Sequence, residues 1–153
     1  MLGELISAEL PKFEHDTIET ASQIGKFEMV LPTLKPLNAK FVVNNVSAFY
    51  FSLLNTKITQ YIYIKKNLSS MNGKESGITV TCGGNIKLLE VPNFEMEKEA
   101  ELSFEMSLIT LKYDIDKIPV LIYDVQNSSY VVDGIDIYEQ IRKKYFIKDK
   151  NDR

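Results

Sequence analysis

Two glutamates come nearest to a catalytic arrangement in this chain. Glu101 and Glu105 stand four residues apart in an alternating stretch, so both point to the same face of a strand. Two carboxyl groups on one surface can supply the acid and the base, or the nucleophile, that hydrolyse a glycan. A solvated strand face explains the same pattern without any catalysis, and we favour that explanation.

The other reactive side chains form no catalytic set. His15 is the single histidine, which leaves neither a multi-histidine metal site nor a choice of base for a Ser-His-Asp triad. Cys82 shares a strand face with Val80, which predicts a buried structural thiol rather than a nucleophile. No helix with Lys-Ser/Thr follows Gly83-Gly84, so the pair predicts a turn and not a phosphate loop. The sequence therefore predicts a protein that is not an enzyme and holds no cofactor or metal.

Length and charge limit the class of protein. The 153 residues fit one domain, which we place at residues 1–147, followed by a charged, frayed tail at 148–153. A net charge of −3 argues against a surface that grips nucleic acid. Neither a membrane-spanning run nor a signal-peptide pattern is visible. The single cysteine excludes an intramolecular disulfide and suits synthesis in a reducing compartment.

A long alternating strand organises the C-terminal third. From Glu99 to Leu108 apolar and polar residues alternate strictly, which predicts one face in a core and one in water. The polar face carries Glu101, Ser103, Glu105 and Ser107. After Leu108 the alternation changes phase, which indicates either a β-bulge or the passage of the strand from one sheet into another.

A second strand and a helix complete this third. Ile118 to Val125 is predicted to be a strand, reached through a turn at Asp114 to Lys117. Asp133 suits the N-cap of a helix of about three turns, whose last turn carries the basic residues 142–144. Its apolar stripe would be Ile137, Tyr138, Ile141 and Tyr145.

The first two thirds predict further strands and one helix. We expect strands at Glu4–Leu10, Asn38–Val43, Ile58–Lys66, Ile78–Cys82 and Ile86–Val91, the last two joined by a tight turn at Gly83-Gly84-Asn85. Between Phe13 and Leu31 we expect two extended arms around a turn at Ala21 to Gly25. A helix capped by Asn44 or Asn45 would bury Val46, Phe49, Tyr50, Leu53 and Leu54. Asn67 to Gly77 is predicted to be a polar loop.

Together these elements predict a mainly β (α+β) fold, an antiparallel sandwich or barrel with a flanking amphipathic helix and a short C-terminal helix.

Several segments, taken in order, resemble the major tail tube proteins of contractile-tailed phages and R-type bacteriocins. Ser7 to Phe13 is similar to the family's Leu-Pro-Lys-Leu signature, and Leu88 to Val91 with 98–101 is similar to its approach to the long strand. The ending of the family is matched by Leu111–Asp116, Val120–Asp124 and Val131–Asp136. The family has a further strand before the first segment, so either that strand is absent here or a neighbouring subunit supplies the pairing.

The resemblance implies a self-assembling structural protein. Six copies would form a ring whose sheets join edge to edge around a lumen, and rings would stack into a tube that conducts DNA or ions inside a contractile sheath. Sheath, baseplate and tape-measure proteins would be partners, with DNA only as transported cargo and with no membrane binding by this chain. The protein would stand in a virion tail or a phage-tail-like particle assembled in the cytoplasm of a bacterial host.

The resemblance also implies roles for particular residues, each beside a simpler alternative. The lumen wall would be Glu101, Ser103, Glu105 and Ser107, unless this face only meets outer solvent. The arms would contact neighbouring subunits through Glu14, Asp16, Thr17, Glu19, Lys26 and Glu28, unless they form a private hairpin. Asn67, Ser70 and Asn72 would touch the next ring, unless they belong to an ordinary surface loop.

Two rival functions stay open at this stage. A monomeric β-barrel that binds a small ligand or a peptide would need a closed apolar pocket. A glycan hydrolase would need Glu101 and Glu105 to act together.

Overall fold

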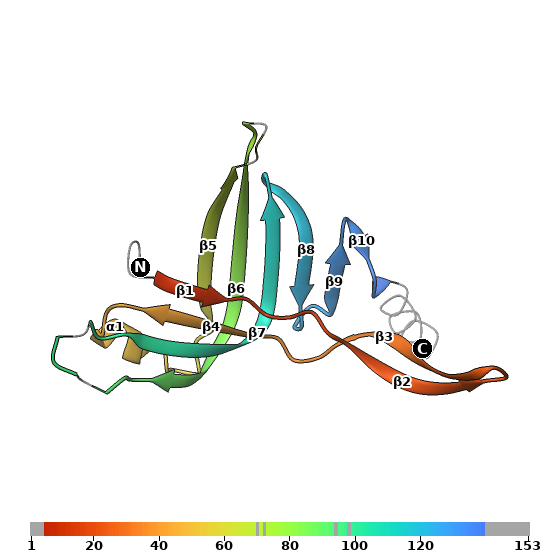
Figure 1. Ribbon diagram of the computed structural model, residues 1–153, viewed down its shortest axis with the longest axis horizontal. Helices are drawn as coiled ribbons and strands as arrows, with labels where there is room; N and C mark the ends of the chain where they lie inside the picture. The colour runs from red at the N-terminus through yellow and green to blue at the C-terminus, as the bar shows by residue number, and fades with distance from the viewer. Residues whose placement is uncertain (1–4, 70, 72, 94, 98, 140–153) are drawn as a thin grey trace, which may run out of the picture. The chain divides into compact units, whose positions relative to one another are not determined.

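The computed structural model describes residues 5–69, 71, 73–93, 95–97 and 99–139, which fold mainly into antiparallel strands (Figure 1). The elements are β1 (Leu5–Glu9), β2 (His15–Ser22), β3 (Gly25–Leu34), β4 (Asn38–Val43), α1 (Ala48–Ser52), β5 (Gln60–Ser69), β6 (Glu75–Glu90), β7 (Leu102–Ile115), β8 (Ile118–Asp124), β9 (Ser129–Val132) and β10 (Ile135–Asp136). The predicted mainly β, antiparallel class is confirmed.

The chain divides into two compact units. The first comprises Met1–Lys57 and Asn85–Leu108, and the second comprises Ile58–Gly84 and Ile109–Arg153. The long strands β6 and β7 each contribute one part to either unit. Our single domain at 1–147 remains a prediction, and the tail at 148–153 lies outside the described residues.

In the first unit, β1, β4 and β7 pair in that order and bury one face. Phe41 of β4 lies opposite Phe104 of β7, with ring centroids 5.3 Å apart, and Tyr50 of α1 packs 6.1 Å from the Phe104 ring. Around these rings lie the buried side chains of Leu37, Ala39, Val43, Leu53, Ile86, Leu102, Met106 and Leu108. Burial of this face is the main stabilising contribution in the unit.

The helix of the first unit is shorter than we predicted. Its N-cap is Ser47, not Asn44 or Asn45, and it ends at Ser52. Tyr50 and Leu53 are buried as expected, whereas Phe49 and Leu54 are 57% and 46% exposed. Aromatic residues and serine are weak helix formers, so only the one turn that packs against the sheet is helical.

The two predicted arms pair with each other. β2 and β3 form a two-stranded antiparallel sheet, in which Ile18 lies opposite Met29 and Glu19 lies opposite Glu28. The Ser22 hydroxyl donates a hydrogen bond of 2.8 Å to the Gly25 carbonyl, which closes the turn. We call this element the β2–β3 hairpin.

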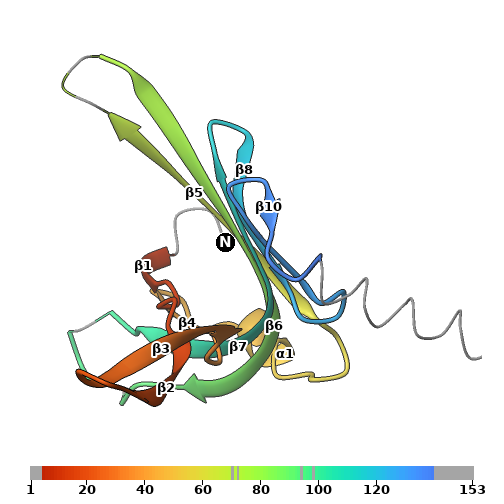
Figure 2. The same cartoon turned by 90° about the vertical axis from the view of Figure 1, so that its right-hand side faces the viewer.

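The second unit is built on the pairing of β5 with β6 and on the strand order β7–β8–β9–β10, in which each strand pairs with the next (Figure 2). Ile62 lies opposite Cys82, and Tyr123 lies between Leu111 and Tyr130 in the register. Ile62, Val80, Cys82, Leu111 and Tyr130 are buried. One face of the β5–β6 pair is thus buried, and the predicted burial of Cys82 beside Val80 is confirmed.

The long strand β7 runs without interruption through its change of phase. Leu102, Phe104, Met106 and Leu108 are buried, and the next buried residue is Leu111. Before the change β7 pairs with β4 as far as Ser107, and after it β7 pairs with β8 from Thr110. The change of phase accompanies this exchange of partner strand.

The predicted turn at Gly83-Gly84-Asn85 is wrong, because β6 is one continuous strand. A Cβ atom at Gly83 would stand 2.7 Å from Cε1 of Tyr61 and 3.2 Å from Cβ of Thr110. Glycine at position 83 therefore leaves room for the Tyr61 ring to lie against the strand, and it does not reverse the chain.

The predicted loop at 67–77 is shorter in the structure, because β5 extends to Ser69 and β6 begins at Glu75.

The predicted helix start at Asp133 is also wrong. Asp133 and Gly134 have φ values of 51° and 77° and form the turn between β9 and β10. Asp-Gly with two positive φ angles is the signature of a tight two-residue hairpin turn. The carboxylate of Asp136 accepts a 3.1 Å bond from the Tyr138 N–H, and the first described helical residue is Glu139. Ile141, residues 142–144 and Tyr145 lie outside the described residues.

We expect Gly83→Ala to lower the free energy of unfolding by about 1–3 kcal/mol, the usual cost of an overpacked site. The half-exposed ring of Tyr61 can move aside, but the contact with Thr110 remains. Gly77→Ala is the control in the same strand, because its Cβ would meet only Asn67 Oδ1 at 3.8 Å. Urea unfolding of both variants measures the difference, and equal values would contradict the close approach.

Candidate functional site

The polar face of β7 joins that of β4. Ser103 lies opposite Val42, Glu105 opposite Lys40 and Ser107 opposite Asn38. Paired residues of antiparallel strands project to the same side, so these side chains form one surface opposite the Phe41–Phe104 core. Three of the four predicted lumen residues therefore share a face, while Glu101 is exposed and precedes β7.

Four charged side chains cross this face in a line, which we call the charge row. Glu9 of β1 lies opposite Lys40 of β4, and Lys40 lies opposite Glu105 of β7. Lys87 of β6 then lies with its Nζ 3.1 Å from Oε1 of Glu105. The signs alternate from strand to strand, so Glu105 has a cation on either side. The sequence did not reveal this compensation, because the partners come from three other strands.

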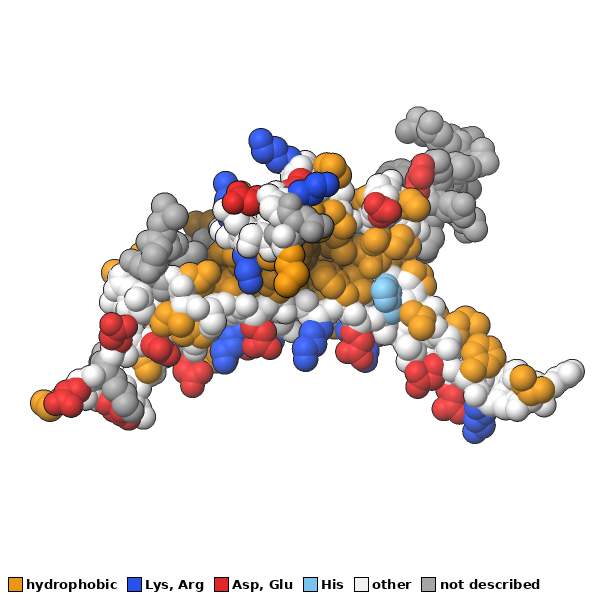
Figure 3. Space-filling model, turned by 45° about the horizontal axis from the view of Figure 1, so that its top comes forward, with side chains coloured by type: hydrophobic (Ala, Val, Ile, Leu, Met, Phe, Trp, Pro, Cys, Tyr) orange, Lys and Arg blue, Asp and Glu red, His pale blue; other side chains and the backbone are white. Residues whose placement is uncertain are grey.

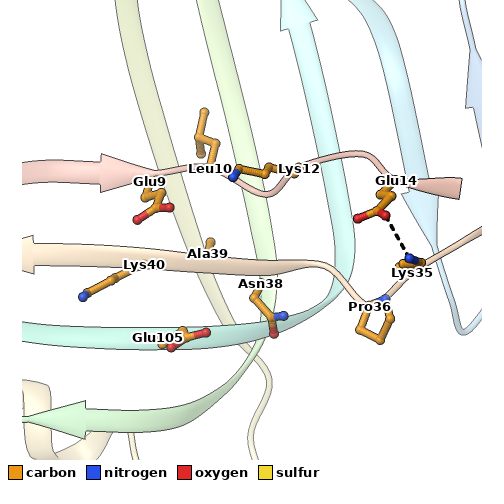
Figure 4. A pocket seen from close by; sticks show the side chains of 10 residues that line it. All are labelled: Glu9, Leu10, Lys12, Glu14, Lys35, Pro36, Asn38, Ala39, Lys40 and Glu105. Atoms are coloured by element: carbon orange, nitrogen blue, oxygen red, sulfur yellow. Dashed lines mark hydrogen bonds and ion pairs between the residues drawn. The ribbon is translucent and has the colours of Figure 1, made fainter.

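An open hollow of about 430 Å³ adjoins the charge row (Figure 4). Its charged lining is balanced, with the carboxylates of Glu9, Glu14 and Glu105 and the amines of Lys12, Lys35 and Lys40. Glu101 is not among its lining residues, so the hollow does not bring the two predicted catalytic glutamates together. The acidic character expected of this face from Glu105 is offset by lysine.

An ion pair connects the two chain segments that enter and leave the β2–β3 hairpin. The Lys35 amine donates a 2.8 Å bond to the Glu14 carboxylate, and the Lys35 N–H donates a 2.8 Å bond to the Glu14 carbonyl. The hydrogen bond and the charge of Lys35 lower the pKa of Glu14, and Glu14 in turn raises the pKa of Lys35. Glu14, a predicted subunit contact, thus has an intramolecular partner.

The β2–β3 hairpin is amphipathic across its two faces. Its apolar face consists of Ile18, Thr20, Phe27 and Met29, which lie in opposed pairs. Ile18, Phe27 and Met29 are 46%, 47% and 43% exposed. Its charged face consists of Thr17, Glu19, Lys26, Glu28 and Val30, with Lys26 3.4 Å from Glu19. Figure 3 shows hydrophobic side chains along this hairpin, at the right of the view.

Sequence reasoning chose the charged residues of the hairpin and missed its apolar face. The alternation of Phe27, Glu28 and Met29 was the signal that could have revealed it. Asp16 lies at the base of β2, and Asn67 lies in β5 opposite Gly77. Ser70 and Asn72 lie outside the described residues.

A comparison with protein families decides what class of protein carries these surfaces. The family model of the phage tail tube protein FII matches residues 1–145. The chain belongs to the phage tail tube protein FII family. A comparison with curated proteins gives no match.

Membership gives this tail tube protein a structural, non-enzymatic role in the tail of a phage particle, where it assembles with itself into a tube. Cys82 is buried, and burial raises the pKa of its thiol to about 11, so it stays protonated at neutral pH. Within the described part of the chain, no cluster of three histidine, cysteine or acidic side chains could hold a metal ion. None of the described helices is long and apolar enough to cross a membrane.

We expect the carboxyl group of Glu14 to titrate below its ordinary pKa of 4.5. A depressed folded-state pKa adds stability above the unfolded-state pKa, and this stability is lost as the pH falls through the folded-state value. Lys35→Met should raise the pKa of Glu14, and Lys12→Met should raise it less, because Lys12 acts only through a weaker Coulomb attraction. Carboxyl-carbon NMR titration measures both shifts. Equal shifts in the two variants would contradict the ion pair.

Proposed function

We propose that this tail tube protein forms the inner tube of a contractile phage tail or of a phage-tail-like particle. Six copies close into a ring, and stacked rings form a conduit for DNA or ions. The observation that carries this proposal is the pair of open strand edges in the first unit. A sheet edge exposes unpaired N–H and C=O groups, and closing a ring satisfies them.

The two open edges belong to β1 and β6. β1 stands at the end of the strand order β1–β4–β7, and β6 pairs with the other side of β7. Among the described residues, β5 pairs with β6 only over Glu75–Gly84. The stretch of β6 from Asn85 to Glu90 therefore has β7 as its one described neighbour. An edge on β1 and an edge on β6 allow one copy to pair with the next in a head-to-tail ring.

The β2–β3 hairpin supplies a second contact between copies. Its apolar face is exposed in the single chain, and exposed apolar faces mark interaction sites. We propose that the neighbouring copy covers this face. Glu14, Asp16, Thr17, Glu19, Lys26 and Glu28 would then form the polar rim of the contact.

The polar face of β7 is our candidate for the lumen wall, with Glu101, Ser103, Glu105 and Ser107 facing the cargo. Lysine offsets Glu105 on this face, which supports a wall of little net charge rather than a repelling acidic one. Neither kind of wall binds phosphates, so DNA would pass without being held.

Asn67, Ser70 and Asn72 remain candidates for the contact with the next ring. Sheath, baseplate and tape-measure proteins are the partners we propose outside the tube, with the bacterial cytoplasm as the place of assembly.

Purified protein at rising concentration tests the proposal. We expect negative-stain electron microscopy to show rings, and then tubes, with a sixfold end view. Sedimentation of the same samples should show mass moving from monomer to ring. A protein that stays monomeric at every concentration, with or without a sheath protein, would contradict the proposed function.

Two neighbouring residues of β3 test the role of the hairpin. We expect Met29→Lys, on the apolar face, to raise the concentration needed for assembly at least about tenfold, because it removes one buried apolar contact per interface. Val30→Lys introduces the same side chain on the charged face and should raise the threshold much less. Sedimentation measures both thresholds. Equal thresholds would show that the apolar face is not covered.

A further inference from the structure

We infer that the charge row sets the register between neighbouring copies, so that Glu9 of one copy lies beside Lys87 of the next. This inference rests on the proposed ring and names the residues that meet at its junction. The occupant of the open β6 edge is therefore a second copy of this chain, presenting its β1 strand.

The direction of the strands allows this junction to be antiparallel. β1 runs opposite to β4, and β4 runs opposite to β7. Lys87 lies beside Glu105 and Gly83 lies beside Thr110, so β6 runs opposite to β7. In the order β1–β4–β7–β6 the strand direction alternates, so β6 runs opposite to β1. A copy placed beside β6 by rotation about the ring axis therefore presents a β1 strand that is antiparallel to β6. The whole ring can then share one antiparallel hydrogen-bond pattern.

The charges at the two edges are complementary. Within one copy the charge row reads negative, positive, negative and positive, from Glu9 to Lys87. A following copy begins again with Glu9, so the alternation continues across the junction. Neighbouring strands lie about 4.8 Å apart, which brings the two side chains within reach of an ion pair.

Other registers lose this complementarity. A slip of one residue along β1 turns the opposed side chain to the other face of the sheet. A slip of two residues places Ser7 or Pro11 at the level of Lys87, and neither carries a charge. Glu9 is therefore the acidic residue of β1 that can lie beside Lys87 while the apolar residues of β1 still face the core.

Charge reversal of each edge, followed by mixing, tests the register. Glu9→Lys gives a copy with two positive edges, and Lys87→Glu gives a copy with two negative edges. Each variant alone should need at least about a tenfold higher concentration to assemble, because like charges meet at every junction. An equal mixture should assemble at a clearly lower concentration than either variant alone, since alternating copies pair opposite charges at every junction of a ring of even number. Lys12→Glu, a reversal in the same hollow but outside the charge row, is the control and should assemble normally.

Cysteine crosslinking tests the same contact without reversing a charge. The buried Cys82 is the only native cysteine, so new surface cysteines can be oxidised selectively. The double variant Glu9→Cys with Lys87→Cys should give a ladder of disulfide-linked species up to the full ring, and either single variant should not. Native rings, together with no rescue on mixing and no ladder, would overturn the register and leave the proposed function standing. A native protein that forms no rings would instead overturn the proposed function.

Discussion

The strict alternation of β7 is the constraint on which the first unit depends. Leu102, Phe104 and Met106 occupy the core, so the backbone must turn Ser103, Glu105 and Ser107 to the opposite side. Because β4 pairs with β7 and β1 pairs with β4, their side chains alternate between the same two faces of the sheet. The hydrophobic face of the sheet thus determines which residues of these strands lie together on its polar face. The structural role of a tail tube protein rests on such surfaces rather than on a reactive group.

The sheet of the first unit stays incomplete at its edges, and this links its fold to its assembly. A monomeric binding module would be expected to protect its edges and to enclose an apolar pocket. The hollow beside the charge row is instead open and lined by equal numbers of carboxylates and amines. The hairpin adds an exposed apolar face to the same unit. These features favour a subunit over a self-contained receptor.

Local patterns predicted the strands well where one residue type dominates one face. Strict alternation predicted β7, and strands were also predicted at β4, at β8 and at the two arms that form β2 and β3. The predictions that proved wrong concern short sequence motifs that are compatible with two different local structures. Gly83-Gly84 suits a turn as well as a crowded strand, and only the Tyr61 ring decides between them. Asp133-Gly134 suits a helix cap as well as a hairpin turn. The charge row could not be predicted, because it depends on how four strands pair with one another, and the sequence of one segment does not specify that pairing.

The charge row carries two positive and two negative side chains in every copy. In a tube built as we propose, this contribution cancels within each subunit and does not accumulate as rings are added. The electrostatic potential that cargo experiences from the row would then be independent of tube length. A long tail and a short one would then both receive zero net charge per ring from this row.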